Sequence, residues 1–304
     1  MPHITIDIGS NSAVILIAER DESGEWRSLY EKAETVRFGA EIDENGFLTK
    51  DVIAACASVI KEYKKAWESF GGGSVMAAAT GVLRDAKNFS ELKAALEAEA
   101  GVSPILLSAD EEARILYLAV RHHCKEKAMG GVVAIDVGGY TTEVSWGKEE
   151  KPEYSQSYKL GCVELTQKYW LENRPSGKTL KDVRAEVSER WRQYLFPENL
   201  KDYEIIASGG TITTIAALLQ ELTVYDAEKV HGFVINKRDI EDLLNENLVI
   251  NPAAERVMKG VMDIKRAEVI LAGSLIFDEF MSLYNVSRLQ VNERGLRWGL
   301  LHTI

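Results

Sequence analysis

The sequence predicts an α/β protein that is built from two domains of the same plan. Segments with the pattern of β-strands alternate with segments of helical pattern along the whole chain, which is typical of this class. The length of 304 residues exceeds that of a usual single domain. One pattern also occurs twice, beginning at Ile4 and again at Val133: an apolar strand, an aspartate, a glycine and a small polar turn. Such a repeat indicates a duplicated domain.

The first half begins with apolar and β-branched runs that favour strands. Strands are expected at 4–8, 13–19, 26–33, 75–80 and 105–107. Between Val52 and Trp67 apolar residues recur three and four positions apart, which indicates a helix with one buried face. Three glycines that begin at Gly71 end this helix. Two further helices, each beginning at a serine that can cap it, are expected at 90–101 and 108–122.

The second half repeats this alternation. A turn at Gly130 and Gly131 precedes its first strand. Strands are expected at 132–136, 143–146, 154–159 and 204–207. Helices are expected at about 162–172, 179–195, 212–221, 237–247, 253–260, 264–283 and 293–302.

The charge balance excludes several classes of partner. The chain carries 36 Lys and Arg against 47 Asp and Glu, a net charge of −11, and has no Lys/Arg-rich run, so we expect neither nucleic acid nor a membrane as a partner. No run of about 18 apolar residues is present, and 4–8 predicts a strand rather than a signal peptide. Cys56, Cys124 and Cys162 lie far apart, which argues against a disulfide framework or a zinc site and favours a cytoplasmic protein.

The duplicated hairpins predict phosphate binding at two positions. In each hairpin a glycine lets the backbone approach a phosphate closely, and consecutive N–H groups can bind an anion. Asp7 and Asp136, at the strand ends, could hold Mg²⁺. An ordinary hairpin would explain one copy, whereas two copies favour a ligand site. A third glycine loop, at 208–211, opens a helix, where free N–H groups also favour anions.

Two further segments carry charged groups that suit phosphate chemistry. The acidic residues 110–112 begin a helix, and they either cap it or supply a general base that activates water. Arg84 follows a buried strand and could bind phosphate oxygens through two N–H groups, although lone surface arginines are common. The spacing alone does not choose between these interpretations.

Together these segments resemble the exopolyphosphatase/guanosine pentaphosphate phosphohydrolase (Ppx/GppA) family, which belongs to the superfamily of acetate and sugar kinases, heat-shock ATPases and actin. The matching segments are IDIGSNSAVILIAE at 6–19, ATGVLRDAKN at 79–88, LSADEEARILYLAV at 107–120, AIDVGGYTTEVSWG at 134–147, KLGCVEL at 159–165, ASGGTITTIAAL at 207–218, KRAEVILAGSLI at 265–276 and LQVNERGLRWGLL at 289–301. One such segment is a weak sign, but eight in the family's order are a strong one.

The resemblance implies two actin-like (ribonuclease H-like) domains with a cleft between them. The first domain would comprise residues 1–123 and 288–304, with the last helix returning to it, and the second would comprise 124–287. Glu112 corresponds to the family's catalytic base. The metal-binding residues implied are Asp136 and Glu143, with Asp7 as a further candidate. The residues that would surround phosphate are Asn11, Arg84, Gly138, Gly139, Thr141, Gly209 and Thr211.

Three positions depart from the family pattern. Val14 replaces a basic residue, Tyr140 stands in a loop that the family has as Gly-Gly-Gly-Ser, and Glu164 replaces an arginine. Each change lowers the expected attraction for a long polyanion, because phosphate contacts depend on positive charge and on close backbone approach. Lysines that could compensate are Lys148, Lys159 and Lys265.

The function that the resemblance implies is Mg²⁺-dependent hydrolysis of terminal phosphoanhydride bonds. The substrate would be inorganic polyphosphate, with short chains favoured, or guanosine pentaphosphate. Two alternatives stay open: a polyphosphate- or guanosine polyphosphate-binding sensor with little or no turnover, and a kinase or ATPase of the same superfamily. Members of the family often pair, so a homodimer would fit.

Overall fold

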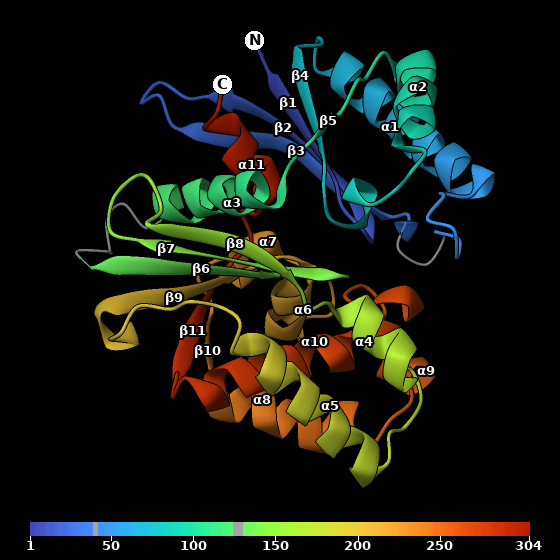
Figure 1. Cartoon of the computed structure of the whole chain (residues 1–304). Coiled ribbons are helices and arrows are strands. Elements are labelled where there is room, and N and C mark those ends of the chain that lie inside the picture. Colours follow the sequence, from blue (N-terminus) through green and yellow to red (C-terminus); the bar gives the residue numbers. More distant parts are fainter. Residues whose placement is uncertain (39–41, 124–129) are drawn as a thin grey trace. The chain divides into compact units, whose positions relative to one another are not determined.

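The computed structural model describes residues 1–38, 42–123 and 130–304. These residues form two compact units, each with its own β-sheet (Figure 1). The first unit comprises Met1–Ile115 and Leu296–Ile304, and the second comprises Leu116–Gly295. Both units alternate strands with helices, as the sequence predicts. No helix in the described part of the chain is long and apolar enough to cross a membrane.

The first unit contains a five-stranded sheet in the order β3–β2–β1–β4–β5. Its strands are β1 (His3–Ile8), β2 (Ser12–Arg20), β3 (Trp26–Thr35), β4 (Ser74–Ala79) and β5 (Ile105–Leu106). Its helices are α1 (Lys50–Ser69), α2 (Phe89–Ala100), the first half of α3 (Ala109–His123) and α11 (Leu296–Leu301). β1, β4 and β5 are parallel to one another, so their carboxyl ends lie at one edge of the sheet.

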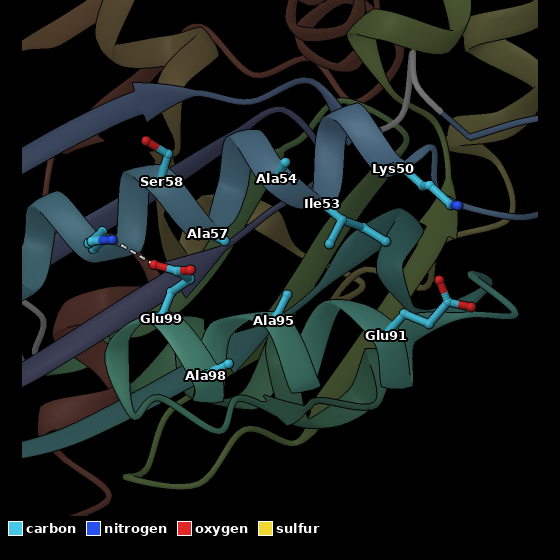
Figure 2. A pocket seen from close by; sticks show the side chains of 10 residues that line it. Lys50, Ile53, Ala54, Ala57, Ser58, Glu91, Ala95, Ala98 and Glu99 are labelled. Atoms are coloured by element: carbon cyan, nitrogen blue, oxygen red, sulfur yellow. Dashed lines mark hydrogen bonds and ion pairs between the residues drawn. The ribbon is translucent and has the colours of Figure 1, made fainter.

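Helices α1 and α2 pack side by side and leave a shallow groove between them (Figure 2). The groove has a volume of about 580 Å³, and half of its ten lining residues have small side chains, among them Ala54, Ala57 and Ala95. Lys61 and Glu99 form an ion pair of 2.7 Å across it. None of the predicted site residues lines this groove.

The C-terminal helix α11 is fastened to the first sheet by polar bonds and by apolar contacts. The carboxylate of Glu31 on β3 accepts hydrogen bonds from Nε and Nη2 of Arg297, at 2.8 and 2.6 Å, and from Nε1 of Trp298, at 3.1 Å. The hydroxyl of Thr5 donates to the carbonyl of Arg297 at 2.8 Å. The buried cluster around this helix consists of Ala78, Leu107, Ile115, Leu296 and Leu300.

The second unit contains a six-stranded sheet in the order β10–β11–β9–β6–β7–β8. Its strands are β6 (Gly131–Val137), β7 (Thr141–Gly147), β8 (Tyr154–Lys159), β9 (Tyr203–Ser208), β10 (Val234–Asn236) and β11 (Arg288–Asn292). Its helices are α4 (Cys162–Tyr169), α5 (Gly177–Trp191), α6 (Gly210–Leu219), α7 (Ala227–Val230), α8 (Lys237–Leu243), α9 (Ala253–Arg256) and α10 (Ile264–Leu283).

Helix α10 is the central helix of the second unit. Nearly every residue from Ala267 to Met281 is buried, which is why its sequence is apolar on all sides and lacks the polar stripe of a surface helix. The side chain of Asp263 caps it by accepting the N–H of Arg266 at 2.8 Å. The indole of Trp191 on α5 donates to the carbonyl of Ile276 at 2.9 Å and so joins α5 to α10.

The unit boundaries differ from the predicted ones at both connections. The prediction placed all of 108–122 in the first domain, but Tyr117 and Val120 of α3 pack with Val132, Ala134 and Ile206 of the second sheet. The prediction also assigned all of 288–304 to the first domain, whereas β11 pairs with β9 and β10 in the second sheet. Only α11 returns to the first unit. Cys124 lies outside the described residues, while Cys56 and Cys162 are free and buried.

Candidate functional site

Three segments of the first unit begin where its parallel strands end. β1 leads into the loop 9–11, β4 leads into the short 3₁₀ turn Gly81–Arg84, and β5 leads into α3. Ile8 is level with Ala79, and Ala79 is level with Leu106, so these segments start side by side. In α/β sheets, ligands bind at the carboxyl edge. Three predicted residues, Asn11, Arg84 and Glu112, therefore come from this edge.

The first two of these segments fit closely together. The N–H of Val82 donates to Oγ of Ser10 at 2.8 Å. Gly81 has a φ of +59°, and a Cβ at this position would lie 2.0 Å from Oγ of Ser10, so no larger residue fits. The carbonyl of Asn11 accepts two backbone N–H groups from the residues after β3, both at 2.9 Å. The loop that carries Asn11 is thus held from two sides.

The side chains of Arg84 and Glu112 form an ion pair at this edge, and they are 18% and 13% exposed. Burial raises the pKa of the Glu112 carboxyl, while Arg84, the N–H of Gly81 and the hydroxyl of Thr80 favour its ionised form. A carboxylate with a raised pKa is a better general base than an ordinary one. The predicted base and a predicted phosphate-binding arginine thus lie together, and the arginine binds the base.

Asp7 and Val14 occupy directly opposite positions in the hairpin of β1 and β2. Opposite residues of an antiparallel pair present their side chains on the same face. A basic side chain at position 14 would therefore neighbour the Asp7 carboxylate, and Val14 places an apolar side chain there instead.

In the second unit, Gly138 and Gly139 turn the chain from β6 to β7. The N–H of Gly138 donates to the carbonyl of Thr141 at 2.9 Å, which closes the turn. The carbonyls of both glycines accept the N–H groups of the first three residues of α4, at 3.0, 2.8 and 3.2 Å. A Cβ at Gly161 would lie 2.2 Å from the carbonyl oxygen of Gly139, so the loop rests directly on the start of α4.

Polar side chains form a row across five strands of the second sheet. From β11 to β8, the residues that stand opposite one another are Asn292, Ser208, Asp136, Glu143 and Ser157. Because opposite residues share a face, the two predicted metal ligands Asp136 and Glu143 are neighbours. The hydroxyl of Ser157 donates to Oε1 of Glu143 at 2.6 Å, and Nδ2 of Asn292 donates to Oγ of Ser208 at 3.1 Å. Glu143 is only 3% exposed, so this serine helps to solvate a buried carboxylate.

The loop between β9 and α6 meets this row at Gly209. Its φ of +89° and ψ of 169° belong to a region that essentially only glycine adopts. A Cβ here would lie 2.1 Å from Oδ1 of Asp136, so the carboxylate rests against the glycine backbone. The hydroxyl of Thr211 donates to the carbonyl of Val137 at 3.0 Å and joins this loop to β6. The structure thus brings Asp136, Glu143, Gly209 and Thr211 together within the second unit.

Arg266 on α10 is a candidate site residue that is not among those predicted from the sequence. A Cβ at Gly210 would lie 2.6 Å from its Nη2, so the guanidinium lies against the N-terminus of α6. Its charge also favours the thiolate form of Cys162, although burial raises the pKa of that thiol overall. Within the described residues, no carboxylate forms an ion pair with it. Its position in the segment 265–276 is a signal that could have found it.

The negative charge of Glu164, which lowers the expected attraction for a polyanion, is offset by an arginine within the second unit. Nη1 and Nη2 of Arg190 on α5 bind the two carboxylate oxygens of Glu164 at 2.5 and 2.9 Å. The compensating cation is thus an arginine, and not one of the three lysines considered. The hydroxyl of Tyr140 donates to Oε1 of Gln167 at 3.0 Å, so its side chain reaches toward α4.

The acidic part of the polar row fits Mg²⁺, which the resemblance implies. Magnesium in phosphate-processing sites usually takes one or two carboxylates and fills its other positions with water and substrate phosphate. Asp136 and Glu143 supply two neighbouring carboxylates of this kind. Among the described residues, no group of three His, Cys, Asp or Glu could hold a metal, so a site composed of protein ligands alone does not form there.

Comparison with known proteins gives matches over the whole length of the chain. The model of the Ppx/GppA phosphatase family matches residues 2–304. A bifunctional 3-dehydroquinate synthase/phosphatase of Fusobacterium nucleatum is 27% identical over 311 residues, and the match covers 98% of this chain but only 46% of that protein. Exopolyphosphatase 1 of Mycobacterium tuberculosis is 28% identical over 301 residues, which cover 97% of this chain and 86% of that one.

Solved structures resemble the chain over the same extent. The crystal structure of the Ppx/GppA family member of Aquifex aeolicus has a TM-score of 0.84 at 32% identity, covering 100% of this chain and 97% of that chain. An exopolyphosphatase-like protein has a TM-score of 0.88, covering 99% and 98%, and at 20% identity it shows the fold alone. These likenesses confirm the predicted α/β fold of two actin-like domains.

Proposed function

Since the chain belongs to the Ppx/GppA phosphatase family, we propose that it is a Mg²⁺-dependent hydrolase of terminal phosphoanhydride bonds in inorganic polyphosphate. The observation that carries this proposal is the largely buried pair of Glu112 and Arg84 at the carboxyl edge of the first sheet. Relatives named exopolyphosphatases support the choice of substrate.

Glu112 acts as the general base in this proposal. Its carboxylate accepts a proton from a water molecule, and the water oxygen forms a bond to the terminal phosphorus. The bond from that phosphorus to the bridging oxygen breaks, which releases inorganic phosphate and leaves a chain that is one unit shorter. Arg84 holds the carboxylate in place, and its remaining N–H groups are available to a phosphate oxygen.

We assign the remaining candidates to substrate and metal. Asp136 and Glu143 would hold Mg²⁺, with Asp7 as an indirect ligand. When bound, the ion neutralises charge that develops on the phosphate oxygens. The backbone N–H groups of the two glycine loops, together with Asn11 and Arg266, would bind phosphate.

We propose that short polyphosphates are preferred over long ones. Val14 and Tyr140 remove, respectively, a cation and a close backbone approach that would favour an extended polyanion. Guanosine pentaphosphate as substrate and a homodimer stay predictions from the resemblance, and a cytoplasmic location stays a prediction from the cysteine pattern. The free thiols of Cys56 and Cys162 agree with a reducing location.

The first test is phosphate release from short polyphosphate, long polyphosphate and guanosine pentaphosphate, each with and without Mg²⁺. We expect release from short polyphosphate only with the metal. Glu112→Gln should lower kcat by about 10²- to 10⁴-fold, the usual contribution of a general base.

The matched control is Glu111→Gln. Glu111 is the preceding residue of the same helix, and its carboxylate only caps the helix by accepting the N–H and hydroxyl of Ser108, at 2.8 and 2.7 Å. This variant should keep its activity. Unchanged release by Glu112→Gln would refute the mechanism, and tight binding of guanosine tetraphosphate without turnover under any divalent metal would favour a sensor.

A further inference from the structure

The phosphate loop of the second unit, Gly138–Thr141, is carried by helix α4. Both glycine carbonyls are capped by the first N–H groups of this helix, and the third of those groups belongs to Glu164, at 3.2 Å from the oxygen of Gly139. Gly161 leaves no space between the loop and the helix. A shift of α4 must therefore move the loop with it.

Helix α4 is in turn held at both of its ends by α5. At the N-terminal end, Arg190 binds both carboxylate oxygens of Glu164 and donates to the carbonyl of Lys159 at 3.0 Å. At the C-terminal end, Glu186 accepts hydrogen bonds from Lys168, at 2.8 and 2.7 Å, and from the hydroxyl of Tyr169.

The contacts of Arg190 and Glu186 with α4 form a clamp, and the charges of this clamp alternate in sign. Arg190 stands between two carboxylates, because it also pairs with Glu186 one helical turn earlier on α5. Its side chain is 17% exposed and that of Glu164 is 31% exposed, so water screens the pair only in part. Removing the guanidinium alone would leave the Glu164 carboxylate uncompensated in the first turn of the helix that carries the loop.

We propose that Arg190 is a positioning residue for the phosphate loop. It acts on this loop through Glu164 in two ways. It fixes the place of α4 under the loop, and it neutralises a negative charge that would otherwise weaken phosphate binding there. The proposal rests on the proposed function for the identity of the ligand, but the clamp itself does not depend on it.

Four proteins separate the two effects: wild type, Arg190→Gln, Glu164→Gln and the double variant Glu164→Gln/Arg190→Gln. We expect Arg190→Gln to raise KM for short polyphosphate by about tenfold and to change kcat much less. The double variant should recover most of the loss, since it removes the uncompensated charge together with the cation. If Arg190 only held α4 in place and had no electrostatic role, the double variant would have a KM as high as that of Arg190→Gln.

Amide hydrogen exchange of the peptide 137–142 without substrate gives a readout that is independent of activity. Exchange should be faster in Arg190→Gln than in wild type, and unchanged in the control Arg192→Gln, whose exposed side chain lies just beyond the same helix. If the wild type releases no phosphate, the proposed function fails and the exchange data alone decide on the clamp.

Wild-type exchange and wild-type KM in Arg190→Gln would overturn the proposal. If Arg190→Gln does not fold, Arg190→Lys replaces it, because a lysine keeps the charge but not the two parallel hydrogen bonds. Arg190→Lys should then show faster loop exchange with a smaller rise in KM, and wild-type values of both would count against the clamp.

Discussion

The buried carboxyl of Glu112 sets the acid limit of the proposed reaction. Burial raises its pKa above the ordinary value of a glutamate, and Arg84 opposes this rise. Because a general base must be ionised, activity should fall as the pH drops through this raised pKa. Arg84→Gln removes the opposing charge, so the acid limb of the pH profile of kcat/KM should move to higher pH.

The measurement is a pH profile of kcat/KM for wild type and Arg84→Gln at saturating Mg²⁺. An acid limb at the same pH in both proteins, or at lower pH in the variant, would contradict the assignment of the pair. Arg114→Gln, on the same helix, is the control for loss of one positive charge, and its acid limb should match wild type.

At the level of single residues, the sequence predicts identities better than pairings. Glu112 and Arg84 belong to matching segments, yet nothing in their spacing shows that they bind each other. Arg190 belongs to none of the matching segments. Its pairing with Glu164 is also invisible in a local pattern, because the two residues lie 26 positions apart and on different helices. Pairings of this kind are set by how helices pack, and a local pattern does not contain that information.

The connection between β9 and α6 depends on one glycine. Gly209→Ala would force a side chain into a backbone region that costs about 1–3 kcal/mol for such a residue. The new Cβ would also displace the Asp136 carboxylate, because their separation would be 2.1 Å. We therefore expect a lower free energy of unfolding. We also expect Mg²⁺-dependent phosphate release per folded molecule to fall.

The control is Gly24→Ala in a turn of the first unit. Gly24 also has a positive φ, of +85°, but nothing lies within 4 Å of the position that its Cβ would take. This variant should lose stability and keep its activity per folded molecule. Thermal unfolding and metal titrations on both variants make the comparison, and equal activities would argue against a role for Asp136.

Long elements are easier to predict than short ones. The helix predicted at 264–283 is α10 with the same bounds, because its apolar composition persists over twenty residues. β10 and β11 are absent from the prediction, since three and five residues carry too little alternation to be recognised. The missed strand β11 is the reason that the second unit extends to Gly295, beyond the boundary predicted at 287.

The molecule as a whole has two cores that can be weakened separately. Glu31 is 25% exposed and holds Arg297, which is 11% exposed, together with Trp298. Glu31→Gln should destabilise the first unit by about 1–3 kcal/mol, because it removes the negative charge that binds the partly buried guanidinium of Arg297. Hydrogen exchange resolved by peptide should then quicken in β1 and β2 and stay unchanged in β6 and β9.

The control is Glu19→Gln, which removes the exposed pair of Glu19 and Arg27, 36% and 65% exposed, from the same sheet. Its effect on the free energy of unfolding should be within about 0.5 kcal/mol. Equal acceleration of exchange in both units by Glu31→Gln would show that they unfold as one.

The return of the chain after β11 also has a consequence for synthesis on the ribosome. β11 is needed to join β10 to the second sheet, and α11 covers apolar residues of the first. Domains usually fold in order as they emerge, the N-terminal one first. Here the first unit is incomplete until residues 296–301 have been synthesised, which happens only after the whole of the second unit has been translated. A premature stop codon at position 288 would therefore leave both units unfinished and expose both to proteases.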